Sequence, residues 1–137
     1  MSTFAVTGKF FHNYFYLWVF AYVIKGYGMT HISIYRTKEG KYRGITCIGH
    51  AGYGNSGEDI VCAAISALVI NTNNSLERLA GIAPAAVINE EEGLLDLRWL
   101  ADENEKMQLL MDSLVLGLTG ILNQYGKAYI DLTFEEV

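Results

Sequence analysis

A histidine and a cysteine flank a short stretch near the middle of the chain. His50 ends one apolar segment, and Cys62 lies twelve residues later, near the start of another. A cysteine becomes an effective nucleophile when its pKa is lowered and a base lies within hydrogen-bond reach. The pair is therefore a candidate for covalent catalysis by a thiol, with His50 as the base and Cys62 as the nucleophile. The alternative is that Cys62 is a small core residue and His50 is inert.

The connection between these two residues is rich in glycine, which lets the backbone adopt angles that other residues avoid. Its glycines are Gly49, Gly52, Gly54 and Gly57. We expect the segment from Gly49 to Asp59 to be flexible, because functional loops often combine mobility with a rigid scaffold. Such a connection lets the chain double back, so that the end of a strand and the start of a helix lie side by side.

Asp59 is predicted to begin the helix that carries Cys62. As an N-cap, its short carboxylate accepts hydrogen bonds from the backbone N–H groups of Val61 and Cys62. Cys62 then lies in the first turn, near position N3, where the helix dipole favours a thiolate. The unpaired N–H groups of that turn are candidates to stabilise an oxyanion. We expect Asp59 to act as a cap rather than as a catalytic acid.

Other residues with chemical potential are assigned simpler roles. Ser66 lies one turn beyond Cys62 on the same helix face, where it either hydrogen-bonds near the site or bonds back to a backbone carbonyl. Cys47 lies on an apolar strand face and is predicted to be a core residue. His31 and His12 have no partner that makes a site, and the cysteines and histidines lack the spacing of zinc ligands. We therefore expect neither a metal nor another cofactor.

The same glycines also form a dinucleotide-binding pattern, G-x-G-x-x-G, over residues 52–57. In nucleotide-binding folds an acidic residue about 20 positions further on binds the ribose. Glu77 has this spacing, but it falls inside the predicted helix. The Gly-Lys-Ser/Thr ending of a Walker loop is absent. A nucleotide-binding module is therefore the less favoured alternative.

Periodicity from Met29 onward predicts the element order ββαββαβ. The expected elements are a hairpin over 31–36 and 42–51, a helix over 60–80, a hairpin over 85–100, a helix over 107–125 and a strand over 128–136. Since two hairpins and two helices must share one core, the economical arrangement is a two-layer α+β fold. We expect a mostly antiparallel sheet with both helices on one face.

Composition limits the class of protein. The chain has 137 residues, enough for a single domain. Two cysteines argue against a disulfide-stapled secreted module and fit a reducing cytoplasm. A net charge of −5 offers no basic surface, so direct binding of nucleic acid is not expected.

Residues 1–28 differ from the rest of the chain. They hold ten of the seventeen aromatic residues, and their apolar run Tyr14–Ile24 is shorter than the roughly 20 residues that cross a bilayer. The codons of Lys25 and Gly26 can spell a purine-rich ribosome-binding site just before Met29. We therefore expect Met29 to be the native start and residues 29–137 to form the domain. The alternatives for residues 1–28 are a membrane-surface anchor or an extra helix packed on the domain.

The block around His50 and Cys62 resembles the signature of a known family. Gly49-His50-Ala51, a short glycine-containing loop, Asp59-Ile60-Val61-Cys62-Ala63-Ala64 and then Ser66 follow one another in the order and spacing of the bacterial ribosomal-processing cysteine proteases, the Prp family. The resemblance covers Met29 to the C-terminus in length and element order. Its specific part is this block.

The resemblance implies a cytoplasmic, homodimeric endopeptidase. Members of the family remove an N-terminal extension from the large-subunit ribosomal protein numbered twenty-seven. By this resemblance His50 is the general base and Cys62 the nucleophile, while Gly49, Asp59 and Ser66 support the site. The glycine-rich loop would close over the substrate. The family lacks an aromatic segment like residues 1–28, which agrees with a start at Met29.

A second class of function remains open on the sequence alone. A protein that keeps this fold and binds a ribosomal protein without cleaving it would be an assembly or interaction factor. The presence of both His50 and Cys62 tells against such a factor. Cleavage of a peptide from the ribosomal protein would distinguish the two.

Overall fold

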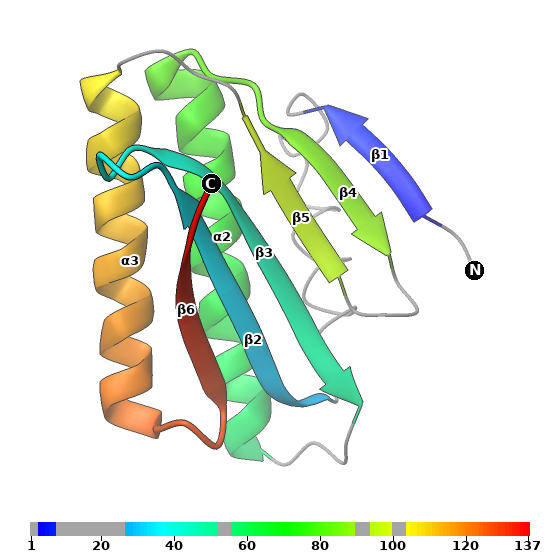
Figure 1. The fold of residues 1–137 in the computed structure, drawn as a ribbon. Helices are drawn as coiled ribbons and strands as arrows, with labels where there is room; N and C mark the ends of the chain where they lie inside the picture. The colour runs from blue at the N-terminus through cyan, green and yellow to red at the C-terminus, as the bar shows by residue number, and fades with distance from the viewer. Residues whose placement is uncertain (1–2, 8–26, 52–55, 90–93, 100–103) are drawn as a thin grey trace.

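The computed structural model describes residues 3–7, 27–51, 56–89, 94–99 and 104–137. Within these ranges, residues 3–7, 27–28, 50–51 and 56–59 are described by their backbone alone. The elements are β1 (Thr3–Thr7), β2 (Tyr27–Arg36), β3 (Tyr42–Ala51), α2 (Ser56–Ala80), β4 (Ala85–Asn89), β5 (Leu94–Arg98), α3 (Glu105–Tyr125) and β6 (Ile130–Glu136). Figure 1 shows their arrangement.

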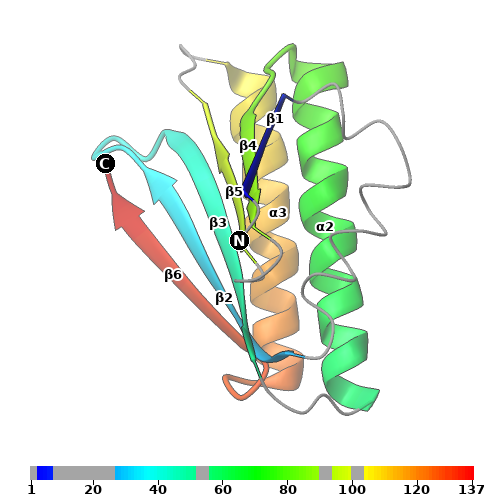
Figure 2. The same cartoon turned by 90° about the vertical axis from the view of Figure 1, so that its right-hand side faces the viewer.

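The strands form one six-stranded sheet in the order β1-β4-β5-β3-β2-β6. All neighbouring strands are antiparallel except β2 and β6, which are parallel. Figure 2 shows α2 and α3 together on one side of this sheet. The predicted two-layer α+β fold, with a mostly antiparallel sheet and both helices on one face, is confirmed.

The N-terminal residues add a feature that the sequence analysis did not predict. Thr3–Thr7 forms β1, which pairs antiparallel with β4 at the edge of the sheet. In addition, β2 begins at Tyr27, two residues before Met29. The proposed boundary between residues 1–28 and the domain therefore falls inside a strand.

The core lies between the inner face of the sheet and the two helices. On β2, Ile32 and Ile34 are buried and alternate with half-buried polar residues, as the period of a strand requires. From α3, four buried residues at helical spacing complete this layer: Met107, Met111, Leu114 and Leu118. These four residues form the buried stripe of α3, whereas Tyr125 at the end of the helix is 36% exposed.

Capping interactions set the ends of the helices. The Asn104 side chain accepts a hydrogen bond from the Met107 N–H at 3.0 Å and thereby caps α3. Its amide group also donates to the carbonyl of Ala80 at 2.9 Å, which joins the end of α2 to the start of α3. Gly81 and Gly126 follow the two helices with positive φ angles of 71° and 90°, which glycine adopts most readily.

Sheet packing requires one further glycine. A Cβ atom on Gly44 would lie 2.6 Å from both the Leu97 carbonyl oxygen and the Arg98 side chain. Because the Leu97 atom belongs to the backbone, no larger residue fits here without a shift of β5. The Arg98 side chain instead passes over Gly44, and its Cζ atom lies 3.6 Å from the centroid of the Tyr35 ring.

Neither helix, within the residues that the structure describes, has the combined length and apolar character needed to cross a membrane. The sheet and its two helices account for the buried apolar side chains described above.

Candidate active site

Cys62 is a buried residue of α2, and this helix begins at the end of the molecule where β3 ends and β2 begins (Figure 1). Its side chain is only 5% exposed. The Sγ atom lies 3.9 Å from Oγ1 of Thr30, a distance at which a thiol and a hydroxyl can hydrogen-bond in either direction. This contact ties the predicted nucleophile to the first residues of β2.

Thr30 connects Cys62 to the strand that carries His50. In the antiparallel register of β2 and β3, Thr30 lies directly opposite Gly49. His50 follows Gly49 in β3, so its backbone belongs to the same end of the sheet. His50 is described by its backbone alone, and a contact between its imidazole and the thiol stays a prediction.

Ser66 acts through the backbone of the site. Its hydroxyl donates a hydrogen bond to the carbonyl oxygen of Cys62 at 2.8 Å, and its side chain is fully buried. Of the two roles left open by the sequence, the bond back to a backbone carbonyl is the one observed. This hydrogen bond therefore stabilises the turn of α2 that contains Cys62.

The predicted start of the helix is wrong. α2 begins at Ser56, so Asp59 lies inside the first turn rather than at the N-cap. Cys62 consequently lies in the second turn and not near N3. The acidic pair Glu58 and Asp59 suits the positive end of the helix dipole, which favours this earlier start. The free N–H groups of a helix belong to its first four residues, so that of Cys62 is not among them.

Two glycines of the segment that was predicted to be flexible lie in regular elements. Gly49 pairs within β3 through the ladder with β2, and Gly57 lies in the first turn of α2. Both glycines therefore belong to regular elements, because strand pairing and helix formation extend closer to each other than the sequence pattern indicated. Gly52 and Gly54 lie outside the described residues, so their role as loop residues stays a prediction.

The nucleotide-binding alternative gains no support from the fold. Glu77, at the spacing of a ribose-binding residue, lies within α2 as predicted. The strand that follows the helix, β4, is separated from β3 by β5 rather than lying beside it. Among the described residues, no group of three or more His, Cys, Asp and Glu side chains is placed to hold a metal.

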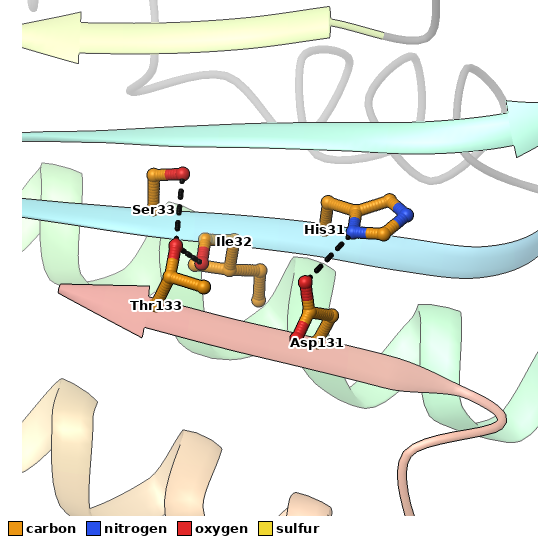
Figure 3. A network of polar contacts seen from close by, with 5 residues as sticks. All are labelled: His31, Ile32, Ser33, Asp131 and Thr133. Carbon is orange, nitrogen blue, oxygen red and sulfur yellow. Dashed lines mark hydrogen bonds and ion pairs between the residues drawn. The ribbon is translucent and has the colours of Figure 1, made fainter. Parts of the chain in front are cut away.

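His31 has a partner that the sequence did not reveal. Its Nδ1 lies 3.0 Å from Oδ2 of Asp131, as Figure 3 shows. The two residues are adjacent in the parallel register of β2 and β6. By strand alternation, His31 points to the face of the sheet opposite Thr30, and therefore away from Cys62. The pair is separate from the site and does not contradict the expectation that His31 has no partner that makes a site.

Cys47 is confirmed as a core residue. Its side chain is completely buried, and burial together with the nearby charge of Asp96 raises the pKa of its thiol to about 12. Such a thiol is protonated at neutral pH and is a poor nucleophile. Cys47 is therefore not a candidate nucleophile, as predicted.

Thr30 is the site residue that the sequence analysis missed. A signal was present, because Thr30 is the polar member of an inward-facing series completed by Ile32 and Ile34. A buried polar side chain on an apolar face needs a hydrogen-bond partner. Its partner, however, is 32 positions away in the chain.

Comparisons with known proteins identify the family of this chain. The family described as Cysteine protease Prp matches residues 29–131. A Ribosomal processing cysteine protease Prp of Staphylococcus aureus is 28% identical over 99 residues, which cover 72% of this chain and 93% of the relative. Its counterpart in Bacillus subtilis is 31% identical over 81 residues, covering 56% of this chain and 72% of the relative.

Solved structures show the same fold. A protein of Streptococcus mutans superposes with a TM-score of 0.72 at 30% identity and covers 80% of this chain and 97% of its own. The Prp protease of S. aureus, solved in complex with a substrate peptide, gives a TM-score of 0.71 at 27% identity, covering 78% and 100%. The predicted family and activity class are therefore confirmed. The chain belongs to the Prp family of cysteine proteases and is a cysteine endopeptidase.

Proposed function

We propose that this endopeptidase removes the N-terminal extension of the bacterial large-subunit ribosomal protein numbered twenty-seven. Its relatives in S. aureus and B. subtilis are named as ribosomal processing proteases, and the S. aureus protein has been solved with a substrate peptide. The block from Gly49 to Ser66, which carries the family resemblance, is complete in this chain. These observations support the maturation of a ribosomal protein over general proteolysis.

The proposed catalytic pair is Cys62 as nucleophile and His50 as general base. The observation that carries this assignment is the contact of Cys62 with Thr30, which lies opposite the residue preceding His50. This contact supports a shared location of the Cys62 thiol and the His50 backbone at one end of the sheet. Cys47, with its thiol held protonated by burial, offers no alternative nucleophile.

The chemistry follows from these roles. His50 accepts the proton of Cys62, and the thiolate attacks the scissile carbonyl carbon to form a tetrahedral intermediate. His50 then donates the proton to the leaving amine, which breaks the peptide bond and leaves a thioester. Water, deprotonated by His50, hydrolyses the thioester and restores the free thiol. The step needs no metal ligand and no redox partner.

Three further residues are proposed to support this pair. Ser66 holds the carbonyl of Cys62, and Gly49 lies opposite Thr30 where the strand approaches the site. Asp59, in the first turn of α2, lies one turn before Cys62. We propose that the connection containing Gly52 and Gly54 closes over the bound peptide.

The test is cleavage of a synthetic peptide that spans the extension and the first residues of the mature ribosomal protein. The wild-type chain is expected to release the extension, and Cys62→Ala and His50→Ala are expected to release none. Cleavage that persists in Cys62→Ala would refute the assignment of the nucleophile. Binding of the peptide by the wild type without cleavage would instead favour a ribosome-assembly factor.

We also propose that the enzyme acts as a homodimer in the bacterial cytoplasm. The family resemblance supports both statements, and the reduced state of Cys47 and Cys62 fits a reducing compartment. Light scattering after size-exclusion chromatography is expected to give twice the mass of one chain. A mass of one chain at micromolar concentration would refute the dimer.

We propose, finally, that translation starts at Met29 in the native cell. The match to the Prp family begins at this residue, which supports the proposal. The intact mass of the protein purified from its own cell is expected to correspond to residues 29–137. A mass that includes residues 1–28 would overturn it, and β1 would then be part of the native sheet.

A further inference from the structure

The buried hydroxyl of Thr30 stands out on the inner face of β2. Thr30 is 0% exposed, and the next residues on the same face are the apolar Ile32 and Ile34. Because an unpaired hydroxyl in a protein interior is costly, such a group is retained where it has a hydrogen-bond partner. Here that partner is the thiol of Cys62, at 3.9 Å.

The position of this hydroxyl is fixed from both sides of the strand. Thr30 pairs with Gly49 of β3 and with Ile130 of β6, and its N–H donates to the carbonyl of Tyr129 at 3.0 Å. Threonine is branched at Cβ, which restricts its χ1 angle. The backbone and the side-chain branching therefore hold Oγ1 at a defined point of the sheet.

Cys62 is held from two directions as a result. Ser66 donates to its backbone carbonyl from within α2, at 2.8 Å, while Thr30 contacts its sulfur from the sheet. The Ser66 contact stabilises the helical turn that contains Cys62, and the Thr30 contact is made to Sγ, the atom proposed to react. A group that contacts the sulfur can influence its reactivity directly.

We infer that Thr30 is a positioning residue for the nucleophile. This inference rests on the proposed role of Cys62. The hydroxyl holds the thiol in one orientation and donates a hydrogen bond to the sulfur once the proton has moved to His50. Thr30 keeps its own proton throughout, so the proton balance of the reaction is unchanged. The ionisable pair His31 and Asp131, on neighbouring positions of β2 and β6, points to the other face of the sheet.

Two substitutions in the full chain separate the hydroxyl from the methyl group. Thr30→Val keeps the volume and removes the hydroxyl, whereas Thr30→Ser keeps the hydroxyl and removes the methyl group. We expect kcat for the ribosomal-protein peptide to fall about tenfold in Thr30→Val, with KM within about twofold of the wild type. Thr30→Ser is expected to keep kcat within about threefold of the wild type.

The Tm of the two variants provides the matched control, because Thr30→Ser should have the higher kcat and Thr30→Val the higher Tm. Loss of a buried methyl group is expected to lower the Tm of Thr30→Ser below that of Thr30→Val. Activity that follows the hydroxyl while stability follows the volume supports positioning. An unchanged kcat in Thr30→Val, or an equal loss in both variants, overturns the inference.

A substrate-free measurement distinguishes failure of this inference from failure of the proposed function. Iodoacetamide alkylation of Cys62, followed by peptide mass spectrometry, is expected to slow about tenfold in Thr30→Val and to recover in Thr30→Ser. If the wild type leaves the ribosomal peptide intact but alkylation shows this pattern, the substrate proposal fails and the role of Thr30 stands. If the wild type cleaves the peptide and Thr30→Val cleaves and alkylates equally fast, the role of Thr30 alone is overturned.

Discussion

The two cysteines occupy two regions of the molecule that differ in what surrounds the sulfur rather than in how deeply it is buried. Cys47 lies in the middle of the sheet, between Ile32 of β2 and Leu95 of β5, and is 0% exposed. Cys62 lies at the end of the sheet and is 5% exposed. Burial alone therefore does not distinguish the two cysteines.

The difference lies in the polar groups that each region supplies. Around Cys47 the paired strands supply apolar side chains, and burial followed by the charge of Asp96 raises its pKa to about 12. Around Cys62 the sheet supplies the hydroxyl of Thr30, and β3 ends nearby with the backbone of His50. The proposed nucleophile thus lies where regular strand pairing ends and polar groups can approach it.

The largest expected effect comes from removing each sulfur in turn. Cys62→Ala is expected to lower peptide cleavage by at least about a thousandfold, because no other group can form the thioester. Cys47→Ala is expected to keep cleavage near the wild-type rate and to lower the free energy of unfolding by about 1 kcal/mol. Cleavage assays and urea denaturation of the two variants test these expectations. Loss of cleavage in Cys47→Ala but not in Cys62→Ala would show that Cys47 is the nucleophile.

The free energy of unfolding at alkaline pH is expected to depend on two buried residues of β3, Cys47 and Tyr42. Burial, and then the hydrogen bond to Asp112, raises the pKa of Tyr42 to about 12 as well. Because folding raises both pKa values, the unfolded chain loses these protons first. The stability that depends on them is complete below about pH 9 and is lost as pH rises through the folded values, at up to about 1.4 kcal/mol per pH unit for each group.

The measurement for this prediction is the free energy of unfolding from pH 8 to pH 12. Cys47→Ala and Tyr42→Phe are each expected to make the fall in stability less steep than in the wild type. Tyr42→Phe also loses the 2.7 Å hydrogen bond to Asp112, so its stability at neutral pH is expected to be about 1 kcal/mol lower. An equally steep fall in both variants would show that other groups determine the alkaline limit.

A smaller effect is expected further along α2, away from the site. Asn73 is 0% exposed, and among the described residues neither of its amide atoms has a hydrogen-bond partner. It lies on a buried stripe with Val69 and Leu76. Asn73→Leu is expected to raise the free energy of unfolding by about 1 kcal/mol without changing cleavage, because it removes an unpaired polar group. A clear loss of stability in urea would indicate that the amide is paired through ordered water.

The smallest effect is expected at His31. Its pair with Asp131 is partly exposed, with side chains that are 37% and 45% accessible. Such pairs contribute between about 0 and 1 kcal/mol to stability. His31→Ala is expected to change the free energy of unfolding by less than about 1 kcal/mol and to leave cleavage within about twofold. A loss of cleavage as large as that expected for His50→Ala would place His31 in the catalytic machinery.

Local patterns in the sequence were sufficient to predict most of the fold. The alternation around Ile32 and Ile34 predicted a strand, and the spacing from Met107 to Leu118 predicted the buried face of α3. Gly81 and Gly126 marked the ends of both helices. These features depend on residues a few positions apart, so periodicity and capping preferences report them.

Features that depend on long-range packing were predicted less well. The start of α2 was placed at Asp59 instead of Ser56, because either residue is a good cap by type. Ile60, near the start of this helix, is apolar but 57% exposed because only one face of α2 meets the sheet. β1 was not predicted, since its pairing with β4 joins distant parts of the chain.

The site itself shows the same division. The types and spacing of His50 and Cys62 indicated the chemistry, because both belong to one short block of sequence. Thr30 could not be joined to Cys62 without the fold, since they are 32 positions apart. The pairing of His31 with Asp131, 100 positions apart, depends on the parallel register of β2 and β6.

The most direct test of the account compares the two thiols within one molecule. The folded 137-residue chain is treated with limiting iodoacetamide at pH 7, and the modified fraction of Cys47 and Cys62 is measured by peptide mass spectrometry. The account predicts that Cys62 is modified at least about a hundredfold faster than Cys47. Equal rates, or a Cys62 that reacts only after unfolding in urea, would contradict the claim that this end of the sheet holds a reactive nucleophile.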